Sequence, residues 1–310
     1  MSEFSLEPLA PQQPHRPKVS YIVITMNRPH DLAVCLESLR RQTLPSFEII
    51  VVDNCSTDDT LQILARDFPD VRVVALKENR GVSGGRNAGV EQAHGDVCIF
   101  IDDDAWFPEP TAGERTVAYF DRDPALVCVA YTIHDSVTGI EEMKSIPRRD
   151  KKHISEDYQT TYFCGAGFAL RRAPFVEVGM FWDPLVYGSQ EIDVSYRFLE
   201  MGWRLVHTGS IVVKHKSSPL ARPSGQWVYF NTRDRPWVAI RNLPWIAVAT
   251  TTFLWWSNTL VVAWRGRQLH RFFAGVRDSF RGISVAFRSR KSIQKKTIDK
   301  LHRLSGRYWF

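Results

Sequence analysis

Strand-like and helix-like segments alternate from residue 19 to residue 101 of the chain. Leucines recur at helical spacing in residues 31–41 and 58–68. The expected strands, rich in β-branched and aliphatic residues, are 19–25, 47–52, 71–76 and 97–101. Such alternation predicts an α/β fold in which right-handed crossovers join parallel strands and helices cover both faces of the sheet.

The last of these strands runs into three consecutive carboxylates, Asp102, Asp103 and Asp104. Neighbouring carboxylates raise one another's pKa unless a cation neutralises them, and oxygen ligands suit a hard ion such as Mg²⁺ or Mn²⁺. Open α/β sheets bind ligands at the edge formed by the carboxyl ends of their strands. We therefore expect a metal site at this position, the alternative being a solvated acidic turn.

A glycine-rich stretch, residues 79–89, opens an expected helix that Gly95 would close. Its glycines do not have the spacing of the dinucleotide-binding fingerprint, and no Walker lysine follows. The stretch either packs a helix closely on the sheet or points the start of the helix at a phosphate. Because Thr25, Asn27, Asp53 and Asn79 also lie at the carboxyl ends of strands, we favour a nucleotide pocket.

Four motifs in order, VSYIVITMNRP, EIIVVDNCSTDDT, NRGVSGGRNAGV and IFIDDD, resemble the nucleotide-sugar half of a family 2 glycosyltransferase with the GT-A fold. The resemblance covers residues 18–220 and is nearest to bacterial rhamnosyl- and galactofuranosyltransferases. It implies that Asp102 and Asp104 form an Asp-x-Asp motif joining Mg²⁺ or Mn²⁺ to the nucleotide. The nucleotide-binding residues that it implies are Thr25, Asn27, Arg28, Asp53, Gly84, Arg86, Asp102 and Asp103. For Thr25 and Asn27, capping of a strand end is the alternative.

Inverting transfer of a sugar needs a base for the acceptor hydroxyl, and Glu191 and Asp193 are the candidates. On a helix these two side chains lie about 200° apart, so they do not face one cleft. Arg197 stands four residues after Asp193, and this pairing explains Asp193 without catalysis. The resemblance implies Glu191 as the base, although the family more often carries Glu-Asp or Asp-Asp where this chain has Gln190-Glu191.

Two further strands are expected at residues 203–206 and 211–213, each followed by a histidine. The resemblance implies that His215 binds the metal or the diphosphate. His207 is interpreted as structural, which is the usual role of a single histidine after a strand.

Basic residues are concentrated at the carboxyl end of the chain. The net charge of the whole chain is +6, but residues 265–310 carry thirteen Lys and Arg against two acidic residues. Residues 1–17 contain acidic residues and prolines in place of a signal peptide, and they are predicted to be a disordered leader. Five cysteines without metal-ligand spacing predict the reduced thiols of a cytosolic protein.

The uncharged segment 243–264 is long enough to span a bilayer. A single span would put the basic tail on the side of the membrane opposite the nucleotide domain, against the positive-inside rule. We therefore favour interfacial or re-entrant membrane contact for residues 221–310. A buried helical subdomain or oligomer interface, and a true span, are the alternatives. No nucleic-acid-binding motif accompanies the basic tail.

The expected protein is thus a metal-dependent, inverting glycosyltransferase at the cytosolic face of the cell membrane. It would transfer a sugar from a UDP- or dTDP-sugar to a glycan acceptor, most simply a lipid-linked intermediate of O-antigen, capsule or cell-wall polysaccharide. A nucleotidyltransferase that makes sugar nucleotides is one alternative. A non-catalytic sugar-nucleotide-binding partner is the other.

Overall fold

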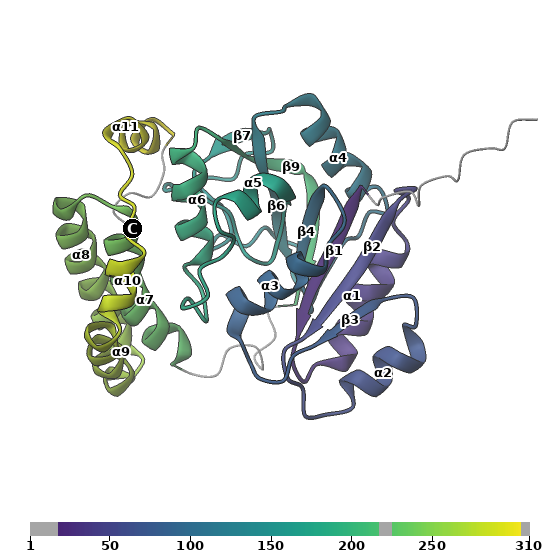
Figure 1. Ribbon diagram of the computed structural model, residues 1–310, viewed down its shortest axis with the longest axis horizontal. Coiled ribbons are helices and arrows are strands. Elements are labelled where there is room, and N and C mark those ends of the chain that lie inside the picture. The colour runs from purple at the N-terminus through teal and green to yellow at the C-terminus, as the bar shows by residue number, and fades with distance from the viewer. Residues whose placement is uncertain (1–17, 217–224, 305–310) are drawn as a thin grey trace, which may run out of the picture.

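The computed structural model describes residues 18–216 and 225–304, so the predicted leader and the predicted domain boundary at residue 220 lie outside the described residues. A nine-stranded sheet in the order β3-β2-β1-β4-β8-β6-β9-β5, with β7 paired to β9, forms the centre of the molecule (Figure 1). The strands are β1 (Val19–Thr25), β2 (Phe47–Asp53), β3 (Arg72–Ala75), β4 (Val97–Asp102), β5 (Ala105–Trp106), β6 (Leu126–Asp135), β7 (Tyr158–Thr160), β8 (Gly167–Arg171) and β9 (Arg204–His215).

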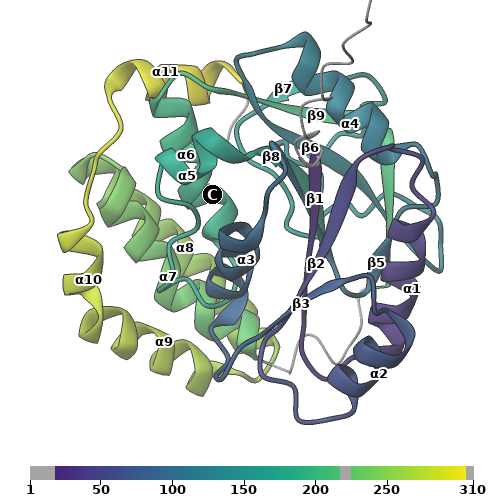
Figure 2. The same ribbon diagram turned by 45° about the vertical axis from the view of Figure 1, so that its right-hand side comes forward.

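Helices flank the sheet and extend beyond it at the carboxyl end of the chain (Figure 2). They are α1 (Pro29–Arg40), α2 (Thr60–Asp67), α3 (Gly81–Gln92), α4 (Ala112–Arg122), α5 (Arg172–Glu177), α6 (Gln190–Glu200), α7 (Gln226–Asn242), α8 (Trp245–Arg265), α9 (Leu269–Arg281), α10 (Ile283–Arg288) and α11 (Lys295–Arg303).

The predicted parallel strands form one half of the sheet. Strands β3, β2, β1 and β4 are mutually parallel, and their register pairs Thr25 with Asp53 and Ile24 with Asp102. The polar residues after these strands therefore meet at a single edge. Antiparallel β8 joins β4 to β6, and β6 is parallel to β9. The two short strands predicted after residue 202 are parts of one strand, β9. Its pairing with β6 shifts register but continues to His215.

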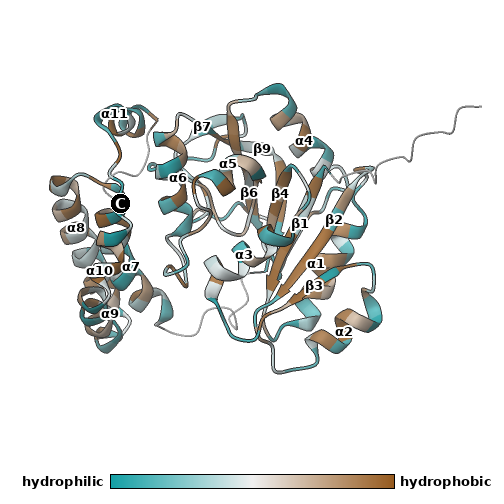
Figure 3. Cartoon of the chain, in the orientation of Figure 1, coloured by the Kyte–Doolittle hydropathy of each residue, from teal (hydrophilic) through white to brown (hydrophobic). Residues whose placement is uncertain are grey.

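Alternate residues of the strands face opposite sides of the sheet, where separate apolar clusters hold the helices. Tyr21 and Val23 of β1 pack in the cluster that includes residues of α1 and α4. Ile22 packs in the cluster that includes residues of α3, α5 and α6. Figure 3 accordingly shows hydrophobic residues concentrated in the central strands. A Cβ at Gly89 would lie 2.5 Å from Ile22 Cγ2, so this glycine lets α3 lie close to the sheet.

Gly95 does not close α3 as predicted. The helix ends at Gln92, because the next residue, Ala93, takes an extended conformation. Gly95 instead lies against β1, where a Cβ would be 2.5 Å from the backbone nitrogen of Ser20. Close approach of two backbones, and not helix termination, accounts for the glycine.

The carboxyl-terminal helices pack on the side of the molecule where α6 lies, away from α1 and α2 (Figure 1). Helix α7 contacts α6, α8, α9 and α10. It joins α8, α9 and α10 to the sheet domain, whereas α11 contacts that domain directly through the bond of Thr297 to Glu200 of α6.

Candidate functional site

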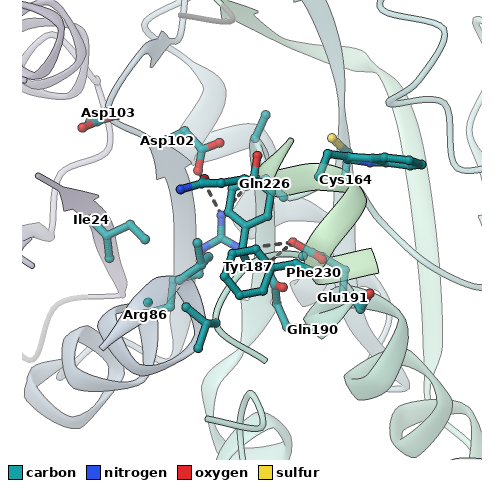
Figure 4. Close-up of a pocket in the computed structure, with 18 of the residues that line it drawn as sticks. Ile24, Arg86, Asp102, Asp103, Cys164, Tyr187, Gln190, Glu191, Gln226 and Phe230 are labelled. Atoms are coloured by element: carbon teal, nitrogen blue, oxygen red, sulfur yellow. Dashed lines mark hydrogen bonds and ion pairs between the residues drawn. The ribbon is translucent and has the colours of Figure 1, made fainter. Parts of the chain in front are cut away.

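A cavity of about 670 Å³ opens at the carboxyl ends of β1 and β4. Its walls come from the start of α3, the segment 186–191, the acidic triplet and the first turns of α7. Figure 4 shows side chains from these elements converging on its interior. The cavity lies where the topology of a parallel sheet predicts a ligand site.

The acidic triplet divides into two groups. Asp103 points away from Asp102 (Figure 4), accepts a hydrogen bond from Thr25 Oγ1 at 2.8 Å and pairs with Arg28 Nη1 at 2.6 Å. Burial raises the pKa of Asp103 to about 7 although Arg28 and Thr25 oppose the shift. Arg28 also pairs with Asp104 at 2.9 Å. Thr25, Arg28 and Asp103 thus line the cavity as one bonded unit at the strand ends.

Asp102, Asp104 and His215 bring one potential metal ligand each to within 4.8 Å of one another. Pairing of β5 with β9 sets Ala105 opposite His215 and so carries the histidine to the triplet. His215 Nε2 lies 3.4 Å from Asp104 Oδ1, and Nδ1 lies 2.8 Å from Glu142 Oε1. Burial lowers the pKa of His215, but its bonds with Asp104 and Glu142 outweigh burial and raise it to about 9. The two carboxylates supply the oxygen ligands that Mn²⁺ and Mg²⁺ prefer, and the imidazole adds a nitrogen ligand of the kind that transition metals take.

Buried Arg86 connects this ligand cluster to Glu191. Its Nη2 lies 3.0 Å from Asp102 Oδ1 and donates to the carbonyl of Gly165 at 2.6 Å. Its Nη1 lies 3.3 Å from Glu191 Oε1. Figure 4 shows the guanidinium between the two carboxylates. One cation therefore holds the candidate metal ligand and the candidate base in a fixed relation.

Glu191 points into the cavity from the first turn of α6. Gln190 Nε2 donates to its Oε1 at 2.8 Å. Burial raises the pKa of Glu191, Arg86 opposes the shift, and Asp102 adds to it. Gln190 stands where the family more often carries an acidic residue. Its amide orients Glu191 through this hydrogen bond and adds no second negative charge.

Asp193, the alternative candidate base, does not line the cavity. It is fully buried, bonded to Arg197 at 2.7 Å, to Asn242 Nδ2 at 2.7 Å and to Arg241. These partners hold its pKa below the usual range in spite of burial. The expected pairing with Arg197 is present, and Asp193 ties α6 to α7. The geometry therefore favours Glu191 over Asp193 as the candidate base.

Three residues that the resemblance implies for the nucleotide do not line the cavity. Asn27, with φ of 56°, accepts from the backbone nitrogen of Thr57 at 2.7 Å and so holds the turn after β2. Buried Asp53 accepts from Ser56 N at 3.2 Å. Gly84 packs on its own helix, where a Cβ would lie 2.7 Å from Arg80 Cβ. Capping of the strand end, the alternative for Asn27, fits its contacts.

Asn79, expected at the nucleotide pocket from its position after a strand, lines the cavity, and so does Asn54, which sequence reasoning did not assign. Asn54 Nδ2 donates to Asn79 Oδ1 at 3.0 Å, and Asn54 Oδ1 accepts from Arg80 N at 2.9 Å. Both follow strands whose carboxyl ends meet at this edge, and that position was the available signal.

The loop after β6 and the start of α7 supply walls that local motifs did not predict. Glu142 and Lys144 line the cavity, and Lys144 Nζ lies 3.1 Å from Glu142 Oε2. Five α7 residues at helical spacing do so as well: Gln226, Trp227, Phe230, Asn231 and Arg235. The region predicted as a separate carboxyl-terminal unit thus forms part of the site.

His207 lies outside the cavity, as its structural interpretation requires. It is buried, with Nε2 3.2 Å from Thr132 Oγ1 and its ring 4.9 Å from that of Tyr158. Burial lowers its pKa to about 4, so the imidazole is neutral in the folded protein.

The sequence pattern of glycosyl transferase family 2 matches residues 20–179, which contain Arg28, Arg86 and the acidic triplet. The chain belongs to this family. The uncharacterized glycosyltransferase YfnE of Bacillus subtilis is 36% identical to this chain over 217 residues, which are 64% of this chain and 53% of that protein. The chain spans 34% to 53% of the length of the Haemophilus influenzae and Bacillus subtilis relatives that it matches.

A further relative is the glucosyl-dolichyl phosphate glucuronosyltransferase of Haloferax volcanii, which is 29% identical over 69% of this chain and 74% of that one. Among solved structures, GalNAc-T7 with UDP, GalNAc and Mn²⁺ superimposes with a TM-score of 0.63. It is 16% identical, over 89% of this chain and 59% of that one. This likeness shows the GT-A fold, as predicted from the sequence motifs.

Proposed function

We propose that the protein is a metal-dependent, inverting glycosyltransferase with Glu191 as its catalytic base. The observation that supports this most directly is the contact of Arg86 with both Asp102 and Glu191, at 3.0 and 3.3 Å. A base joined to a metal ligand through one buried cation lies beside the position of the donor's diphosphate. Family membership and the cavity of about 670 Å³ at the sheet edge support the same assignment.

The donor is a nucleoside-diphosphate sugar, and a UDP- or dTDP-sugar is our proposal for it. Asp102, Asp104 and His215 would hold Mg²⁺ or Mn²⁺, which neutralises charge on the departing diphosphate. His215 must lose its proton to bind a metal, and its raised pKa makes metal affinity fall as the pH is lowered. The solved GalNAc-T7 structure contains UDP and Mn²⁺, a combination that supports this choice by analogy of fold.

Glu191 accepts the proton of the acceptor hydroxyl as that oxygen attacks the anomeric carbon from the side opposite the diphosphate. Its raised pKa suits a base that must take up a proton near neutral pH. Gln190 and Arg86 fix the orientation of the carboxylate. Gly165 leaves room for it, because a side chain there would collide with Glu191 Oε1.

The acceptor is a glycan hydroxyl, and we propose that a lipid carries the glycan, as in O-antigen, capsule or cell-wall assembly. The Haloferax relative is named for a dolichyl-phosphate-linked acceptor, which supports a lipid-linked glycan. The enzyme would work at the cytosolic face of the membrane, through peripheral contact of its carboxyl-terminal helices.

The decisive experiment measures Mn²⁺-dependent release of UDP or dTDP from a panel of sugar nucleotides by the full chain. The Glu191→Gln variant should lose release while its affinity for the nucleotide, measured by calorimetry with Mn²⁺, stays within about threefold. Glu177→Gln, the same change at an exposed glutamate of α5, is the control and should behave as the unchanged protein.

Three results would contradict the proposal. Undiminished release by Glu191→Gln would remove its role as base. Binding without release, for every donor tested, would favour a non-catalytic partner. Formation of a sugar nucleotide from a nucleoside triphosphate and a sugar 1-phosphate would identify a nucleotidyltransferase.

A further inference from the structure

Helix α8 has one face packed against the protein and one face exposed. Trp255, Thr259 and Ala263 are buried, and Trp256 Nε1 donates to the carbonyl of Thr232 in α7 at 2.9 Å. This helix alone among those in residues 18–216 and 225–304 is long and apolar enough to cross a membrane, by length and composition. Because one face of α8 packs against α7 and the other is exposed, α8 lies on the surface of the folded chain in this structure.

The exposed face of α8 is an apolar stripe. Ile246, Phe253, Leu260 and Trp264 follow one another at spacings of seven, seven and four residues, which places them on one side of the helix. Ile246 is 76% exposed, Phe253 70% and Trp264 68%. On the surface of a soluble protein, the exposed face of a helix usually carries polar residues. The exposed face of α8 carries large apolar side chains instead.

Ring contacts beside this stripe join α8 to α9 and α10. Phe280 of α9 lies 5.8 Å from the ring of Trp256, and Phe287 of α10 lies 5.8 Å from that of Trp245. We define the carboxyl-terminal apolar face as the exposed residues Trp245, Ile246, Phe253, Leu260, Trp264, Phe273, Phe280 and Phe287. A patch of this kind over three helices marks an interaction surface.

Cations accompany the apolar face. Exposed arginines on the same helices and their connections are Arg265, Arg267, Arg271, Arg277, Arg281 and Arg288. Asp278 is the acidic residue of α9, and it pairs with Arg277 at 2.8 Å and with Arg281. Aromatic residues with long basic side chains suit a boundary between anionic headgroups and acyl chains, where the arginine stems lie along apolar surface. A second copy docked on this face would bring like charges together.

We propose that this face binds the surface of an anionic bilayer with α8 lying in the plane of the membrane. A spanning α8 would have lipid on all sides, and it would lose its packing on α7 and the Trp256 bond to Thr232. It would also carry the basic tail across the bilayer, against the positive-inside rule. Docking in the plane keeps the packed face of α8 on the protein and gives only the exposed stripe to lipid.

The docked orientation connects the membrane to the cavity. Trp227 of α7 lines the cavity, and its ring lies 6.5 Å from that of Trp255 in α8. Trp255 lies on the packed face of α8, so an acceptor whose lipid is held at the opposite, apolar face would have to extend its glycan past α8 to reach Glu191. This last step depends on the proposed function, whereas membrane binding itself does not.

Binding is tested by flotation of the full chain with vesicles of phosphatidylcholine containing 30% phosphatidylglycerol, and with pure phosphatidylcholine vesicles. We expect the chain to float with the anionic vesicles, and to do so more weakly at high salt or without phosphatidylglycerol. The double variant Ile246→Ser, Phe253→Ser should lower the partition coefficient at least tenfold. The matched control is Val34→Ser, Val137→Ser, two exposed aliphatic positions in α1 and the loop after β6.

Donor hydrolysis by the soluble double variant should stay unchanged, which separates loss of docking from loss of the site or of the fold. Equal flotation of the double variant and the control would overturn the proposal, as would failure of the unchanged chain to float. A dimer in solution that the double variant abolishes would identify the face as a contact between copies instead. Resistance of bound protein to alkaline carbonate would show a spanning helix and overturn the in-plane geometry.

Discussion

The substitution Asp193→Asn separates a structural carboxylate from a catalytic one, because Asp193 and Glu191 lie two residues apart on α6. Asp193 is the buried anion between Arg197 and Arg241. Its replacement by a neutral side chain leaves two guanidiniums with no compensating charge. Breaking a buried ion pair on one side costs about 3–5 kcal/mol.

This cost is measurable as a change in thermal stability. At roughly 2.1 cal/mol/K per residue, the 310-residue chain has an unfolding entropy of about 0.65 kcal/mol/K, so Tm should fall by roughly 5–8 °C. The assay is thermal unfolding followed by circular dichroism, with urea unfolding at 25 °C as the second measure. If α7–α11 separate first from the sheet domain, the transition of Asp193→Asn should also become broader.

Asp278→Asn is the matched control, because Asp278 pairs with two arginines in the same way but at the surface. Surface ion pairs contribute at most about 1 kcal/mol, so Tm should change by less than about 2 °C. If Asp193→Asn kept the wild-type Tm but lost donor hydrolysis, Asp193 would be catalytic and the assignment of Glu191 would be refuted.

The remaining predictions concern the cavity and one buried histidine. Gly165→Ala should lower donor hydrolysis at least tenfold with little change in Tm, because the new Cβ displaces the end of the Glu191 side chain; an active variant would argue against Glu191. Burial raises the pKa of Glu191, so kcat/KM should rise with pH through a value above the ordinary 4.5, and Asp193→Asn should leave that limb in place. Removal of divalent ions with EDTA should abolish release, and Mn²⁺ or Mg²⁺ should restore it; activity in EDTA would exclude the metal role of Asp102. Burial lowers the pKa of His207 from 6.5 to about 4. As the pH falls, the imidazole is therefore protonated in the unfolded chain before it is protonated in the folded protein, and the free energy of unfolding decreases between pH 6.5 and 4. His207→Gln should remove up to ~3 kcal/mol of this loss in urea unfolding across that range, and an unchanged pH profile would contradict it.

The parallel half of the fold could be predicted because it is built from local signals. Residues 19–25 and 97–101 are apolar runs of strand length, and the alternation with amphipathic helices leaves few topologies open. The place of the acidic triplet at the cavity was predictable because its position after a buried strand fixes the sheet edge where it must lie. Arg28, Arg86 and Glu191 were predictable only through the family motifs.

Other parts of the site depend on long-range packing. Nothing near Glu142 in the sequence indicates that its carboxylate lies 2.8 Å from His215 Nδ1, because that contact joins residues 73 positions apart. The cavity wall formed by α7 could not be predicted either. The same polar and aromatic residues would also be expected on a helix face exposed to solvent. Asp53 and Asn54 show most plainly what the sequence could not predict. Successive side chains of a strand point to opposite faces, so a shift of one residue changes which side chain reaches the cavity, and here it is Asn54.

The sequence alone determined the alternation of strands and helices, the edge of the sheet where the carboxylates gather and the excess of positive charge at the carboxyl end. These follow from periodicity, chain direction and composition, which a linear chain already contains. Only the tertiary structure decided that Arg86 lies between Asp102 and Glu191, that Asp193 ties α6 to α7, and that α8 keeps an apolar stripe exposed. The reason is that these properties depend on which surfaces meet, and burial and pairing are set by contacts between distant segments.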